Sequence, residues 1–122
     1  MAEKLGRVLA EAGWPVLIGL AEGIDAAAHR GCLARKGASI AVLGTPLDSV
    51  YAVHQRSLQQ QVGRKGLLVS PNRSGCRVHP GHFAARNRWL LAFAQALEVV
   101  EYPQRSEALI SARWASRIKC LV

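Results

Sequence analysis

The chain has 122 residues, of which 50% are hydrophobic and 20% charged, and its formal net charge is +8. That length suits one domain, residues 1–122, with a hydrophobic core of its own. The sequence contains neither a run of roughly 18–20 apolar residues, as a membrane span needs, nor the charge pattern of a secretory signal, so we expect a cytoplasmic protein without membrane contact.

Helical and extended patterns alternate along the first half of the chain. Apolar residues at helical spacing predict a helix over 2–12, which Gly13 ends. The apolar run 15–20 then predicts a buried strand. A helix over 24–36 and a second buried strand over 39–43 follow.

The second half continues the alternation, with a helix over 54–63, a short strand over 67–70 and a Pro- and Gly-rich loop over 71–82. A helix over about 84–95, a strand over 97–101, a helix over about 107–117 and the start of a strand over 119–122 complete the pattern. We therefore predict an α/β fold, a three-layer, Rossmann-like, open and mostly parallel sheet with helices on both faces. Such sheets normally begin on a strand, so we expect the usual first strand to be lacking.

Ligands of open parallel sheets bind in the loops after the carboxyl ends of the strands. The loop after the first strand contains Gly19, Gly23, Ile24 and Asp25 at the start of a helix, where backbone N–H groups can meet an anion. A tight turn that needs glycine for packing would show the same pattern. Glu22 counts against a phosphate there, because its carboxylate would repel the anion.

Asp25 has two interpretations. It can complement the dipole of its helix, or it can form an acid–base pair with His29, one turn later. No nucleophile accompanies the pair, which weakens the catalytic interpretation.

Two further loops are candidates. Gly44 and Thr45 follow the second strand and either offer donors to a ligand or form a plain turn. A helix beginning near Ala84 would place Arg86 and Arg88 in its first turn, where cations oppose the helix dipole unless a phosphate is bound. Phe83 could stack on a base or belong to the core.

The positive charge is concentrated in the middle of the chain. Residues 49–97 contain no Asp or Glu, and their basic residues are Arg56, Arg64, Lys65, Arg73, Arg77, Arg86 and Arg88. A basic face can be merely solvated. Phosphate backbones, however, select an unbalanced positive field, so the segment favours a polyanionic partner.

The three cysteines, Cys32, Cys76 and Cys120, are too few and too widely spaced for a disulfide scaffold. Cys76 forms a C-x-x-H-x-x-H cluster with His79 and His82, but no fourth metal ligand is evident. We expect reduced thiols, and neither a metal nor another cofactor.

Three separated stretches resemble the DprA/Smf family of DNA-processing proteins. GLAEGIDAAAHRGCLARKGASIAVLGTPLDSVY is similar to the family's stretch with a Gly-rich loop, GID and AVLGxGLD, and FAARNR to its FPxRNR motif. The region from Leu97 through Ser106 to Ala112 resembles its VVEA…SGSLITA segment. The resemblance covers about residues 6–114, with departures at Ile18, Glu22, Ser70-Pro71 and Ala84.

The resemblance implies an extended Rossmann fold that binds single-stranded DNA in a basic pocket, protects incoming DNA in natural transformation and loads RecA, as a homodimer and without enzymatic activity. It implies that Arg86 and Arg88 meet phosphate or buttress the pocket and that Asn87 holds the loop. RecA and homodimer contacts are expected around 109–122. Together with the basic loop, the expected DNA-binding residues are Gly19, Gly23, Ile24, Asp25, Gly44, Thr45, Arg73, Arg77, Phe83, Arg86, Asn87 and Arg88.

Two alternatives stay open at this point. One is a nucleotide-processing enzyme of the related phosphoribohydrolase type, although the sequence has no PGGxGT-type loop; Glu101 follows a strand without such a glycine cradle. The other is a non-catalytic remnant that acts only through protein contacts.

Overall fold

A computed structural model describes residues 1–96 of the chain, and its centre is a parallel sheet. The strands β1 (Val16–Ile18), β2 (Ser39–Val42) and β3 (Leu67–Val69) follow one another in the order β1-β2-β3. Val16 pairs with Ser39 in β2, and Ile40 of β2 pairs with Leu67. The carboxyl ends of all three strands therefore point to one edge of the sheet, which we call the carboxyl edge.

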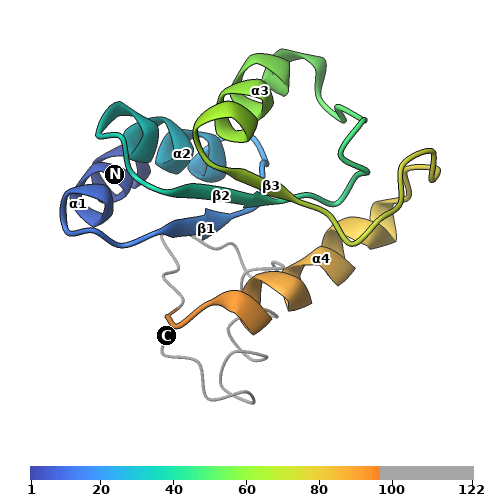
Figure 1. Cartoon of the computed structure of the whole chain (residues 1–122). Coiled ribbons are helices and arrows are strands. Elements are labelled where there is room, and N and C mark those ends of the chain that lie inside the picture. The colour runs from blue at the N-terminus through green and yellow to red at the C-terminus, as the bar shows by residue number, and fades with distance from the viewer. Residues whose placement is uncertain (97–122) are drawn as a thin grey trace.

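Helices cover both faces of this sheet. Two helices lie on one face, α2 (Ile24–Ala34) and α3 (Arg56–Lys65). The short 3-10 helix η1 (Val53–Gln55) directly precedes α3. α4 (Pro80–Phe93) crosses the opposite face, and α1 (Ala2–Glu11) packs beside α2 (Figure 1). The predicted α/β class, with a parallel sheet between helical layers, is confirmed.

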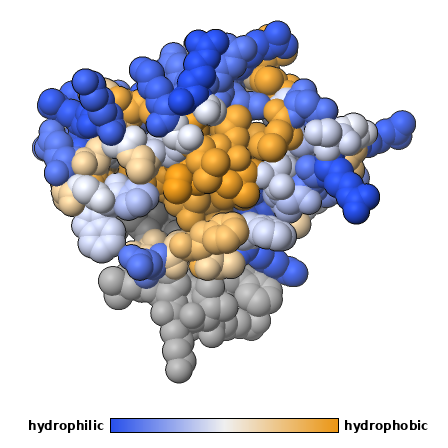
Figure 2. All heavy atoms as spheres, in the orientation of Figure 1, coloured by the Kyte–Doolittle hydropathy of each residue, from blue (hydrophilic) through white to orange (hydrophobic). Residues whose placement is uncertain are grey.

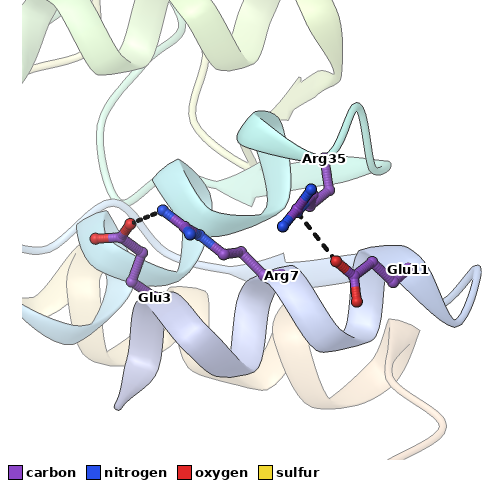
Figure 3. Close-up of polar contacts among 4 residues, drawn as sticks. All are labelled: Glu3, Arg7, Glu11 and Arg35. Atoms are coloured by element: carbon purple, nitrogen blue, oxygen red, sulfur yellow. Dashed lines mark hydrogen bonds and ion pairs between the residues drawn. The ribbon is translucent and has the colours of Figure 1, made fainter.

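Two glycines, Gly6 and Gly31, lie at the contact between α1 and α2. A Cβ atom on Gly6 would overlap the carbonyl oxygen of Ala28, and one on Gly31 would overlap the carbonyl oxygen of Glu3. Ion pairs lie beside this contact, Arg7 with Glu3 at 2.6 Å along α1 and Arg35 with Glu11 at 3.0 Å between the helices (Figure 3). The two backbones can approach this closely only because no side chain separates them.

The core lies between the sheet and the α2/α3 layer. Its buried members are Ala26, Leu33, Ala41, Leu43, Leu58 and Val62, with Leu20 and Leu68 packed against them. This arrangement buries the apolar faces of both helices against the sheet. At the carboxyl edge, residues 21–23 after β1 are exposed, whereas Gly44, Thr45 and Pro46 directly after β2 are buried.

The order of the elements agrees with the sequence prediction, while their bounds are shorter or shifted. The helix predicted over 24–36 ends at Ala34, and the strand predicted over 15–20 is confined to Val16–Ile18. The elements expected over 97–101, 107–117 and 119–122 lie outside the described residues. Within residues 1–96, no helix has the length and apolar character to cross a membrane.

Candidate nucleic-acid interface

Arg86 is a charged side chain in a buried place, with only 7% of its surface exposed. Its Nη1 donates to the carbonyl oxygen of Val42 at 2.7 Å, and its Nε donates to Oδ1 of Asn87 at 3.1 Å. The guanidinium also lies directly over Gly19, where a Cβ atom would overlap it and would come within 2.9 Å of Asp25 Oδ2. Arg86 therefore ties α4 to the ends of β1 and β2.

The prediction that Arg86 and Arg88 stand in the first turn of a helix is wrong. α4 begins at Pro80, because His79 Nδ1 accepts a hydrogen bond from the Gly81 N–H at 2.9 Å and proline suits the first helical position. Arg86 consequently lies in the second turn. The argument that a phosphate must offset two cations at the helix start no longer applies.

The two arginines also face different sides of α4. Residues two apart on a helix with 3.6 residues per turn are rotated by about 200°. Arg86 is buried toward the sheet, whereas Arg88 is exposed. The structure thus joins Arg86 to the loops of the carboxyl edge and places Arg88 on the outer side of the helix.

Side chains from α2 and η1 hold the loop after β1 in place. Gly23, with φ of 82°, precedes α2, and Asp25 Oδ2 accepts a hydrogen bond from the Ala21 N–H at 3.2 Å. Ile24 is the first residue of α2. Glu22 contacts the imidazole of His54 in η1. The carboxylate that counted against a phosphate therefore has a partner of its own.

His29 is a structural residue, and its hydrogen bonds go to Gly19 and Ser39, which argues against the acid–base interpretation of Asp25 and His29. The imidazole is fully buried, with Nε2 at 2.7 Å from the Gly19 carbonyl oxygen and Nδ1 at 2.6 Å from Ser39 Oγ. Because a carbonyl can only accept, Nε2 carries the proton and Nδ1 accepts from the Ser39 hydroxyl. Burial lowers the pKa of His29, against the opposing effects of its bond to Gly19 and the charge of Asp25.

The turn after β2 is held by residues that follow β3. The side chain of Asn72 donates to the Gly44 carbonyl oxygen at 3.0 Å, and the Ser70 hydroxyl donates to the Thr45 carbonyl oxygen at 2.6 Å. The family resemblance implied only that Asn87 holds a loop, and the roles of Ser70 and Asn72 at this turn were not expected from the sequence. The signal was present, since Ser and Asn directly after a strand often bond to nearby backbone in turns.

Phe83 borders an aromatic depression at the carboxyl edge. Its ring packs on the backbone of Gly44, and its centroid lies 4.9 Å from that of Tyr51, at an interplanar angle of 60°. Tyr51, Val78, Pro80 and Phe83 line a hollow of about 340 Å³, and Tyr51 is 71% exposed. Sequence reasoning did not single out Tyr51, although an aromatic residue in a loop after a strand was its visible signal.

Exposed cations occur in the loop that leads to this depression. Arg73 and Arg77 lie in the loop between β3 and α4, whose first residues hold the Gly44–Thr45 turn and whose last residues line the hollow. Figure 2 shows hydrophilic side chains at the right margin, where this loop lies in Figure 1. In the described part of the chain neither arginine forms an ion pair.

The C-x-x-H-x-x-H cluster does not converge on a common point. His79 Nδ1 is occupied by the helix cap, and Cys76 Sγ donates to the Arg77 carbonyl oxygen at 3.8 Å. Among the residues that the structure describes, no three His, Cys, Asp or Glu side chains are grouped as metal ligands.

Comparison with known proteins identifies relatives over nearly the whole chain. Residues 1–122 match the family model described as DNA recombination-mediator protein A. "Protein Smf" of Synechocystis sp. is 42% identical over 113 residues, covering 93% of this chain and 28% of the relative. "DNA processing protein DprA" of Streptococcus pneumoniae is 38% identical over 96 residues, covering 79% of this chain and 34% of the relative. The chain thus spans about a third of these relatives' length.

Two solved structures share the fold. The X-ray structure of DprA from Streptococcus pneumoniae has a TM-score of 0.84 and 33% identity, over 95% of this chain and 42% of that one. DNA processing protein A from Helicobacter pylori, described for its single-stranded DNA binding mode, has a TM-score of 0.89 and 26% identity. The match covers 98% of this chain and 54% of that protein.

Proposed function

Since this chain belongs to the DNA recombination-mediator protein A family, we propose that it binds single-stranded DNA at the carboxyl edge of its sheet and acts in DNA processing during transformation. The Helicobacter pylori relative supports the choice of ligand, because that protein is described as binding single-stranded DNA. The geometry of the carboxyl edge supports it independently.

One observation carries the proposal, the aromatic depression next to a loop whose Arg73 and Arg77 form no ion pair within residues 1–96. Tyr51 presents its ring from the loop after β2 and Phe83 from the first turn of α4, and Arg73 and Arg77 lie in the same loop as Val78, which lines the hollow. Exposed rings stack on the faces of bases, and cations follow the phosphates. In a duplex the base faces are covered by their neighbours, so this combination favours a single strand.

The other residues expected from the sequence form the floor and the support of this interface. We assign the backbone of Gly23, Ile24 and Asp25, which is exposed or half-buried, to the floor, and the buried Gly19, Gly44 and Thr45 to the layer beneath it. Arg86 and Asn87 hold these loops in place, because Arg86 bonds both to Asn87 and to the Val42 carbonyl oxygen at the end of β2. We assign Arg88 to a phosphate that passes the outer side of α4.

The assignment is to binding and not to catalysis. His29, which could have served as a base, is buried and bonded on both ring nitrogens. On the basis of the family resemblance we extend the proposal to RecA loading and a homodimer. The residues expected to serve both, around 109–122, lie outside the described part of the chain.

Fluorescence anisotropy tests the proposal with a labelled six-nucleotide oligo-dT, a labelled DNA hairpin and a series of salt concentrations. We expect tighter binding to the single strand. Arg73→Gln/Arg77→Gln should lower the salt slope by about 1.4, at about 0.7 per lost phosphate contact on single strands. Tyr51→Ala should cost about 1–3 kcal/mol of binding free energy, the usual worth of one stacked base.

Lys4→Gln/Arg30→Gln is the matched control, because it removes the same charge from exposed positions of α1 and α2. A loss in this control as large as in Arg73→Gln/Arg77→Gln would mean that only net charge matters. Equal affinity of the wild type for hairpin and single strand, in protein shown to be folded by circular dichroism, would contradict the proposal.

A further inference from the structure

The ends of α2 and α3 lie beside each other at the amino-terminal edge of the sheet, opposite the carboxyl edge. Gly66 directly follows α3 and packs on the start of β2, since a Cβ atom there would overlap the carbonyl oxygen of Ser39. The start of β1 joins the same edge, where the Val16 N–H donates to the Ala38 carbonyl oxygen at 2.8 Å. Segments distant in sequence therefore come to the same edge of the sheet (Figure 1).

This edge carries cations without matching acids. Lys36, Arg64 and Lys65 are exposed, and within residues 1–96 none of them forms an ion pair. Arg35 is paired with Glu11 (Figure 3). The other described acids lie elsewhere, on the first turn of α1 or after the carboxyl ends of β1 and β2, namely Glu3, Glu22, Asp25 and Asp48. The described residues therefore give this edge a positive charge.

Complementing the helix dipoles explains part of this pattern. A cation in the last turn of a helix is favourable, and α3 ends with Arg64 and Lys65. It does not explain Trp14, which lies in the turn entering β1 at the same edge and is 52% exposed. An exposed indole at the same edge as cations that form no ion pair within residues 1–96 combines the two features with which proteins bind single strands, a ring for a base and charges for phosphates.

We propose that this amino-edge surface, formed by Trp14, Lys36, Arg64 and Lys65, is a second contact for the backbone of a single DNA strand that already occupies the carboxyl edge. The inference rests on the proposed function and extends it. β2 alone spans about 13 Å at about 3.3 Å per residue. A strand must therefore run on past the first interface before it reaches the second, so the contact depends on strand length.

Two labelled oligo-dT probes of six and 24 nucleotides test this in salt-series anisotropy with the 122-residue chain. We expect the wild type to show a steeper salt slope on the long probe. Arg64→Gln/Lys65→Gln should lower the slope on the long probe by about 1.4 and leave binding of the short probe unchanged. Trp14→Ala should weaken binding of the long probe alone. Lys4→Gln/Arg30→Gln is again the matched control.

The inference fails if Arg64→Gln/Lys65→Gln and the control behave alike on the long probe. It also fails if Arg64→Gln/Lys65→Gln weakens the binding of a polyglutamate peptide but not that of the long probe. The surface would then bind an acidic protein. Failure of the proposed function shows separately, as absent binding of the short probe or indifference to Arg73→Gln/Arg77→Gln.

Discussion

At the scale of single residues, Arg86 and His29 are polar groups that the fold buries for structural reasons. A buried polar or charged side chain is tolerated only when hydrogen bonds replace its hydration. Arg86 meets this condition at the carbonyl of Val42 and at Asn87, and His29 meets it at Gly19 and Ser39. Both side chains hold the loop after β1 in place, so their substitution tests the support of the interface and not its contacts.

Gly19 and Arg86 form a coupled pair. Gly19→Ala should displace the guanidinium, and Arg86→Ala should leave the Val42 carbonyl oxygen without its donor. We expect each to lower the free energy of unfolding by about 1–3 kcal/mol. In the double variant the new methyl group occupies the vacated space, so the loss should fall short of the sum by about 1 kcal/mol or more. Urea unfolding of the four proteins measures this, and simple additivity would contradict the coupling.

The buried His29 should make the free energy of unfolding depend on pH. The folded protein keeps the imidazole neutral because burial lowers its pKa, while the unfolded chain protonates it near the usual value of about 6.5. Below that pH the unfolded state binds more protons, so the contribution is fully present above about pH 6.5 and is lost as the pH falls toward the lowered pKa.

The slope of the free energy of unfolding from this residue is at most about 1.4 kcal/mol per pH unit. Urea unfolding between pH 7.5 and 5.5 measures it in the wild type and in His29→Gln. We expect the variant to be less stable at pH 7.5 and to lose less on acidification. Parallel curves for the two proteins would show that other groups cause the dependence.

At the scale of elements, the contact of α1 with α2 depends on glycines that helix propensity disfavours. Gly31→Ala gains up to about 1 kcal/mol of helix propensity. Its new methyl group, however, would collide with backbone of α1 at Glu3, which a rotamer change cannot relieve. We expect a net loss of about 1–3 kcal/mol in the free energy of unfolding, as for overpacked cores.

Gly63→Ala in α3 is the matched control for this prediction. There the added Cβ would lie 3.1 Å from Leu68 Cδ1, the end of a flexible side chain. Thermal unfolding should show Gly63→Ala equal to the wild type or up to about 1 kcal/mol more stable. Similar losses in both variants would attribute the effect to helix glycines in general and not to the packing of α1 on α2.

At the scale of the whole molecule, the open sheet separates two kinds of surface. The core joins α2 and α3 to one face, and α4 is attached to the other through Arg86 and Phe83. The acid-free segment 49–97 contributes Arg73 and Arg77 to the carboxyl edge and Arg64 and Lys65 to the amino edge. A single basic stretch of sequence thus becomes two separate surfaces, because β3 runs from one edge to the other.

The sequence by itself determined the alternation of strands and helices, the parallel α/β class, the family and the uneven charge. Each of these depends on residues that are close together in the sequence, namely apolar runs, glycines that end helices, and short motifs. The tertiary structure decided which side chains meet. Because α4 starts at Pro80 and not at Ala84, Arg86 lies in the second turn of the helix and not in the first, since one turn takes about 3.6 residues. Tyr51 beside Phe83, and His29 between Gly19 and Ser39, depend on loops that only the packed sheet brings together.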